Sequence, residues 1–135
     1  MVSKLRAQRI AERIQQDLSE VILQEVQDPR ISGAYITGVK VDRELAFADV
    51  YVSAVEGSER SEEIISGLEH AGGYLRSTLA QRVDLRTFPR LRFHWDPTPE
   101  RAERIERLLD SLRPATSEDE ADKLAGMDEE GEKNG

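Results

Sequence analysis

The densest cationic cluster of this sequence is a group of arginines in its second half. Seventeen consecutive residues contain a single acid, Asp84, and five arginines: Arg76, Arg82, Arg86, Arg90 and Arg92. The guanidinium group is planar and always charged, so it binds phosphate through two hydrogen bonds and stacks on nucleobases. The cluster therefore favours contact with RNA. Ion pairs with acids elsewhere in the chain are the alternative that charge alone leaves open.

A second group of bases lies near the N-terminus, where Glu12 is the only nearby acid. Its members are Lys4, Arg6, Arg9 and Arg13. Positive charge at the start of a helix opposes the helix dipole, so the group lowers local stability. It indicates either a polyanion contact or a solvated helix face.

Between two helical patterns the chain carries Ala71, Gly72 and Gly73. Each glycine inside a helix costs about 1 kcal/mol relative to alanine, so two together predict a break or a sharp kink. A kink would bare the backbone N–H groups of the second helix, which suit a phosphate. A simple turn between two helices is the other interpretation.

No arrangement of residues typical of an enzyme is present. The chain has no cysteine, and its two histidines, His70 and His94, lie far apart without metal-ligand spacing. A phosphate-loop spacing that begins at Gly67 lacks the required Lys and Ser or Thr. We therefore expect a protein that is not an enzyme and that needs neither a cofactor nor a metal.

The net charge of −8 over 135 residues is concentrated at the C-terminus. Residues 113–135 hold eight acids and three bases, a net of −5, which leaves −3 for residues 1–112. A folded part so close to neutrality can still carry a basic face. We expect one domain over residues 1–112 and a disordered acidic tail over 113–135. Because no apolar run is long enough to span a membrane, we also expect a cytoplasmic protein.

The hydrophobic pattern predicts the elements that position these residues. Helices are expected from 5 to 27, up to the Ala71 junction, from the junction to Val83, and from 98 to 112, with strands at 35–41, 45–53 and 90–95. Alternation in the first strand places Tyr35, Thr37, Val39 and Val41 on one side. A helix pair between the second and third strands favours parallel neighbours. The fold class is therefore α+β, a three-stranded sheet covered by helices.

Several short segments together resemble one known family, that of ribosome-binding factor A. They are Ala71-Gly72-Gly73, Leu75-Arg76, Asp28-Pro29-Arg30-Ile31, Asp42-Arg43-Glu44-Leu45 and Ala48-Asp49-Val50-Tyr51-Val52-Ser53. The resemblance covers about residues 4–112. It implies a type II KH-like fold in which an Ala-x-Gly kink between two helices replaces the usual Gly-x-x-Gly loop.

The resemblance also implies a maturation factor for the small ribosomal subunit. Such proteins bind free 30S subunits, assist folding and 5′-end processing of 16S rRNA, support growth in the cold, and act in one pathway with ribosome-associated GTPases. They are expected to be cytoplasmic monomers. The RNA-contact candidates are then the kink residues and the bases named above. A protein-interaction module whose basic face binds an acidic partner is the alternative. We further expect joint reversal of Arg76 and Arg82 to weaken subunit binding with little change in thermal stability.

Overall fold

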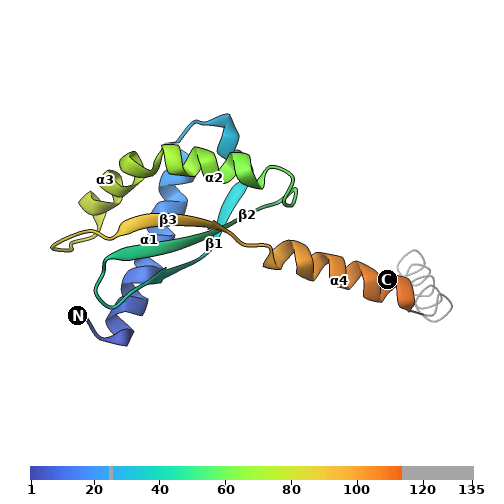
Figure 1. The fold of residues 1–135 in the computed structure, drawn as a ribbon, viewed down its shortest axis with the longest axis horizontal. Coiled ribbons are helices and arrows are strands. Elements are labelled where there is room, and N and C mark those ends of the chain that lie inside the picture. The colour runs from blue at the N-terminus through green and yellow to red at the C-terminus, as the bar shows by residue number, and fades with distance from the viewer. Residues whose placement is uncertain (25, 114–135) are drawn as a thin grey trace, which may run out of the picture. The chain divides into compact units, whose positions relative to one another are not determined.

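A computed structural model describes residues 1–24 and 26–113, which form four α-helices, one short 3-10 helix and three strands (Figure 1). In chain order they are α1 (Lys4–Gln24), η1 (Pro29–Ile31), β1 (Ala34–Val41), β2 (Phe47–Ala54), α2 (Ser61–His70), α3 (Gly72–Arg82), β3 (Arg90–Trp95) and α4 (Thr98–Leu112). Residues up to 100 form one compact unit, and the residues from 101 onward belong to a second. The acidic tail expected over 113–135 lies, beyond Arg113, outside the described residues, and the predicted domain boundary at 112 stays a prediction.

The three strands form one mixed sheet in the order β1-β2-β3. The hairpin partners β1 and β2 are antiparallel, whereas β2 and β3 are parallel and are connected through α2 and α3. A parallel pair requires such a crossover, because the chain must return to the same end of the sheet before the next strand begins. This order confirms the predicted α+β, type II KH-like arrangement.

The core lies between one face of the sheet and the first three helices. Every second residue of β2 is buried there, as shown by Ala48, Val50 and Val52. The helices contribute fully buried side chains at helical spacing: Ile14, Leu18 and Val21 from α1, Ile64 and Leu68 from α2, and Leu75 and Leu79 from α3. Burying one such side chain stabilises the fold by about 1.5–3 kcal/mol. The residues that alternate with the buried ones along these strands face the opposite side of the sheet, and most of them are polar.

The predicted side-chain alternation of β1 is wrong because the strand contains a bulge. The register with β2 shifts between Ile36 and Gly38, so Ile36 pairs with Val52 and Val39 with Val50. One extra residue in a strand reverses the facing of everything beyond it. Ile36 therefore shares the core side with Val39, and Thr37 does not. The Thr37 hydroxyl instead lies 2.7 Å from Asp96 Oδ2, just beyond the end of β3.

The turn after α1 is held by one carboxylate. Asp28 Oδ1 accepts the backbone N–H of Arg30 at 3.0 Å, and Asp28 Oδ2 accepts Arg30 Nη2 at 2.7 Å. The first bond caps η1, whose opening proline needs no N–H partner. The Arg30 guanidinium is thus paired with an acid of its own turn.

This pairing predicts an acid-dependent contribution to stability. Hydrogen bonds from Arg30 lower the pKa of Asp28 from 3.8 to about 2. The unfolded chain therefore takes up the proton near pH 4 while the folded one does not, so the stabilisation exists above about pH 4 and is lost as the pH falls toward 2. We expect the free energies of unfolding of the wild type and of Asp28→Asn to converge over that interval. Urea denaturation at several pH values would measure it, and a constant difference would contradict the role of Asp28.

Helix α4 is amphipathic, as predicted, and its apolar stripe is exposed. Ile105, Leu108, Leu109 and Leu112 follow helical spacing and are 54–79% exposed. Among residues 1–24 and 26–113, no helix has both the length and the apolar character to cross a bilayer.

Candidate nucleic-acid interface

The two helices of the predicted kink are separate elements that meet at Ala71. Helix α2 ends at His70 and α3 begins at Gly72, while Ala71 between them has φ −84° and ψ −1°. Figure 1 shows α2 and α3 as two consecutive helical segments. No side chain caps the start of α3, and the N–H groups of a first helical turn have no partner within their own helix. The predicted break is thus confirmed.

The fold itself does not require glycine at this junction. Of the glycines in the described part of the chain, Gly33 and Gly57 adopt positive φ, whereas Gly72 and Gly73 do not. A Cβ atom added at Gly73 would meet nothing within 4 Å, and one at Gly72 would make an ordinary contact with Phe93 at 3.9 Å. What glycine provides here is a bare backbone on the surface, which permits close approach by another molecule.

Two of the five clustered arginines hold the protein together. Arg76 donates to the carbonyl oxygens of Phe88 and Pro89, at 2.6 and 3.3 Å, and so anchors the segment that leads into β3. Arg82 Nη1 lies 3.1 Å from Glu20 Oε1 on α1 and joins α3 to that helix. Replacing both would remove these links, so the structure leads us to expect a loss of thermal stability from their joint reversal, unlike the expectation from the sequence.

A third arginine is neutralised on the outer face of the sheet. Arg92 binds Asp49 through two hydrogen bonds of 2.8 and 3.1 Å and lies 3.9 Å from the centroid of the Phe47 ring. His94 Nε2 is 2.7 Å from the same carboxylate and stacks on Tyr51 with centroids 5.2 Å apart. These bonds, from Arg92 above all, lower the pKa of Asp49. The ion pair makes Arg92 a weaker phosphate ligand than a free guanidinium.

Arg86 and Arg90 remain available for an external anion. Both side chains are exposed, and neither has a hydrogen bond or ion pair with any residue in 1–24 or 26–113. Helix α3 ends at Arg82, so Arg86 lies in the loop before β3 and does not share a helical face with Arg82. Arg90 is the first residue of β3 and projects from the outer face. Of the predicted cluster, these two cations are the strongest candidates for contact with phosphate.

The N-terminal bases also divide into residues with free cationic groups and one that bonds within the protein. Lys4, Arg6 and Arg9 are exposed and have no charged partner within the described part of the chain. Arg13 instead bonds Asp17 Oδ2 at 2.9 Å and the carbonyl oxygen of Arg82 at 3.0 Å. Arg13 therefore fastens α1 to the end of α3, while the first three keep free cationic groups.

Two further bases, Lys40 and Arg43, lie beside Lys4 and were not among the sequence candidates. In the sequence they stand in a strand and a turn, more than thirty residues from Lys4. Only the packing of α1 on β1 brings them together. The single signal available in advance was the presence of Arg43 in the turn motif of residues 42–45.

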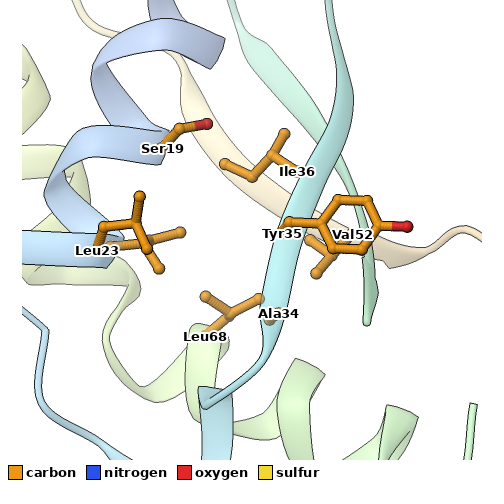
Figure 2. A pocket seen from close by; sticks show the side chains of 8 residues that line it. Ser19, Leu23, Ala34, Tyr35, Ile36, Val52 and Leu68 are labelled. Carbon is orange, nitrogen blue, oxygen red and sulfur yellow. The ribbon is translucent and has the colours of Figure 1, made fainter. Parts of the chain in front are cut away.

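A hollow between α1 and β1 is apolar and offers little chemistry. Figure 2 shows it between α1 and β1, with Leu23, Ala34 and Ile36 among its walls. Its volume is about 120 Å³, and its only side-chain polar atoms are the hydroxyls of Ser19 and Tyr35. The described residues also contain no group of three or more His, Cys, Asp or Glu side chains placed to hold a metal. The chemistry of this surface therefore resides in its cations.

Comparisons with a family model, with related sequences and with solved structures all point to one protein family. Residues 6–109 match the family described as Ribosome-binding factor A. The chain is 44% identical over 109 residues to Ribosome-binding factor A of Alcanivorax borkumensis, covering 80% of each protein. The crystal structure of ribosome-binding factor A from Thermus thermophilus aligns with a TM-score of 0.61 and 28% identity, over 66% of this chain and 93% of that one.

A second set of Thermus thermophilus coordinates was fitted into a cryo-EM map of a 30S-RbfA complex. It aligns with a TM-score of 0.54 and 29% identity, over 64% of this chain and 91% of the other. The family match, the identity over most of the chain and the shared fold all agree. The chain belongs to the ribosome-binding factor A family.

Proposed function

We propose that this protein binds the free small ribosomal subunit and acts there as an assembly factor. Family membership carries the proposal, because a Thermus thermophilus relative has been placed in a 30S complex. The geometry supports it, since Arg86, Arg90 and the bare backbone of Gly73 offer cations and N–H groups to rRNA phosphates. Phosphate contacts supply most of the affinity for nucleic acid in such a surface.

The finer role that we propose is assistance to folding and 5′-end processing of 16S rRNA. In this role the protein works as a cytoplasmic, monomeric, non-enzymatic factor that supports growth in the cold, in a pathway shared with ribosome-associated GTPases. Cells that lack it should then accumulate 16S rRNA with an unprocessed 5′ end, most strongly at low temperature. Primer extension on subunit RNA would measure this, and a fully processed 5′ end in such cells would contradict the processing role.

Co-sedimentation with purified ribosomal particles tests the binding step directly. We expect the protein to sediment with free 30S subunits at about 50 mM salt and to dissociate steeply as salt rises, because each phosphate contact releases counterions. Nuclease treatment should abolish the association. Association that survives nuclease would indicate an acidic protein partner, and failure to sediment with 30S at low salt would refute the proposed function.

The junction offers a variant that separates binding from folding. Gly73→Ala places a methyl group in open space on the surface, so we expect stability to be kept or raised by about 0.5 kcal/mol. If rRNA approaches this backbone closely, the same methyl group should reduce 30S binding severalfold. Gly38→Ala is a matched control, since a Cβ there also meets nothing within 4 Å. Equal 30S binding by both variants in the sedimentation assay would exclude the junction as a contact.

A further inference from the structure

A groove with an aliphatic floor runs between the first half of α1 and the edge strand β1. Its volume is about 430 Å³. Ala7 and Ala11 of α1 line one side, and Val39 and Val41 of β1 line the other. Both alanines are buried, at 5% and 6% exposure, and the two valines pack against the core. The small alanine side chains leave the space open, and Gln8 is the one uncharged polar side chain in its lining.

Three cations complete the lining, and two hydrogen bonds between Val2 and Arg43 bring two of these cations side by side. They are Lys4, Lys40 and Arg43. The N–H of Val2 donates to the carbonyl oxygen of Arg43 at 2.8 Å, and Arg43 Nε donates back to the carbonyl oxygen of Val2 at 3.0 Å. This reciprocal pair of bonds holds the start of α1 against the turn between β1 and β2. Lys4 is thereby kept next to Arg43.

The three cations have little internal compensation. No lining residue is an acid. The Lys40 side chain starts from the outer face of the sheet, where its ammonium lies 5.8 Å from the centroid of the Tyr51 ring, near the limit of a cation–π contact, and its flexible stem can turn round the edge of β1 toward the groove. The carboxylate of Asp42 in the same turn is occupied, because Oδ1 accepts the N–H groups of Ala46 and Phe47 at 2.9 and 2.7 Å. An external anion is therefore the natural partner of this rim.

We propose that the groove binds one nucleotide of single-stranded RNA, with its base on the aliphatic floor and the adjoining phosphates on the three cations. This inference rests on the proposed function and names a surface for it that shares no residue with the Gly72–Gly73 junction or with Arg86 and Arg90. A volume of about 430 Å³ lies in the range of small-ligand sites. Bases in an A-form duplex are paired and stacked, so only an unpaired base can reach such a floor. An acidic peptide without apolar side chains would satisfy the rim but would leave the floor unused.

The test compares the full chain with a double variant, Lys40→Ala with Arg43→Ala. The probe is a fluorescently labelled ten-nucleotide single-stranded RNA, and binding is followed by anisotropy at several salt concentrations. We expect about tenfold weaker binding and a salt slope reduced by about 1.4, the value for two fewer phosphate interactions with a single strand. Arg104→Ala with Arg107→Ala is the matched control, because it removes the same charge from exposed positions of α4. Gln8→Glu serves as a second variant that adds a negative charge to the groove and removes no side-chain hydrogen bond to any residue in 1–24 or 26–113.

Cross-linking with an oligonucleotide that contains 4-thiouridine should modify residues within 4–11 and 39–43. Unchanged binding in both groove variants, or cross-links confined to other segments, would overturn the groove site. Equal competition by duplex RNA or polyglutamate would also overturn it, since a general anion surface would then suffice. Co-sedimentation with 30S distinguishes a failure of the groove site from a failure of the proposed function. If the wild type sediments with 30S and the groove variants bind RNA as the wild type does, the groove site alone is refuted. A wild type that does not sediment refutes the proposed function.

Discussion

Reversing the charge of Arg86 and Arg90 together is expected to weaken binding to 30S subunits by about ten- to a hundredfold at roughly 100 mM salt. Both guanidinium groups are exposed and have no partner in the part of the chain that the structure describes, so the whole of their charge is available to phosphate. Glutamate at these positions replaces attraction by repulsion. The salt slope of binding should fall by about one for each phosphate that the variant no longer neutralises. Sedimentation with purified 30S subunits across a salt series would measure both effects.

The unfolding free energy of the Arg86→Glu, Arg90→Glu variant should stay within about 0.5 kcal/mol of the wild type, because exposed and unpaired side chains contribute little to stability. Arg101→Glu with Arg104→Glu changes the net charge by the same amount at exposed positions of α4 and is the matched control. If both double variants lose the same affinity, overall charge explains the loss and these two arginines have no special role.

Replacing Arg60 by alanine should lower the free energy of unfolding by about 2–4 kcal/mol. Its guanidinium group donates to the carbonyl oxygens of Pro29, Arg30 and Ser32 at 2.9, 2.8 and 2.9 Å. It also lies 3.0 Å from Glu63 Oε1. A single side chain at the start of α2 therefore satisfies three carbonyl groups of the turn around η1, and its removal leaves all three without this charged donor. Urea denaturation followed by circular dichroism would give the free energy.

Two further substitutions sharpen this prediction. Arg60→Lys should recover only part of the loss, because an ammonium cannot present the planar fork that reaches separate carbonyl groups. Arg6→Ala removes an exposed arginine with no partner in the described segments and should change stability by less than about 0.5 kcal/mol. A loss at Arg60 no larger than that at Arg6 would show that the turn around η1 does not depend on the guanidinium.

The elements of this fold could be predicted because their signals are local. The buried positions of α1 recur at helical spacing, and those of β2 alternate, so composition within about twenty residues was enough. The break at Ala71 followed from two glycines in a helical pattern. The bulge in β1 was not predicted, because Gly38 inside a strand pattern is compatible with a bulge but fixes neither its presence nor its position. It is set by pairing with β2 and by the contact between Thr37 and Asp96.

The candidate interface was harder to predict because the state of an arginine depends on its distant neighbours. Arg76, Arg82 and Arg86 look alike in the sequence, yet the first binds carbonyl groups, the second an acid of α1, and the third nothing in the described segments. Each of these partners is brought near only by tertiary packing. The proximity of Lys40 and Arg43 to Lys4 could not be predicted either, because it too arises only from tertiary packing.

The bulge at Thr37 is one extra residue in β1 that the burial of the strand does not require. Many substitutions at Thr37 or Gly38 would keep the number of residues and therefore the facing of the rest of the strand. Deleting Thr37 would restore a regular alternation in which Ile36 and Val39, then two residues apart, still pair with Val52 and Val50 and face the core. What the deletion would remove is the contact of the Thr37 hydroxyl with Asp96 Oδ2. The extra residue therefore serves the link between β1 and the end of β3, and the burial of apolar residues does not depend on it.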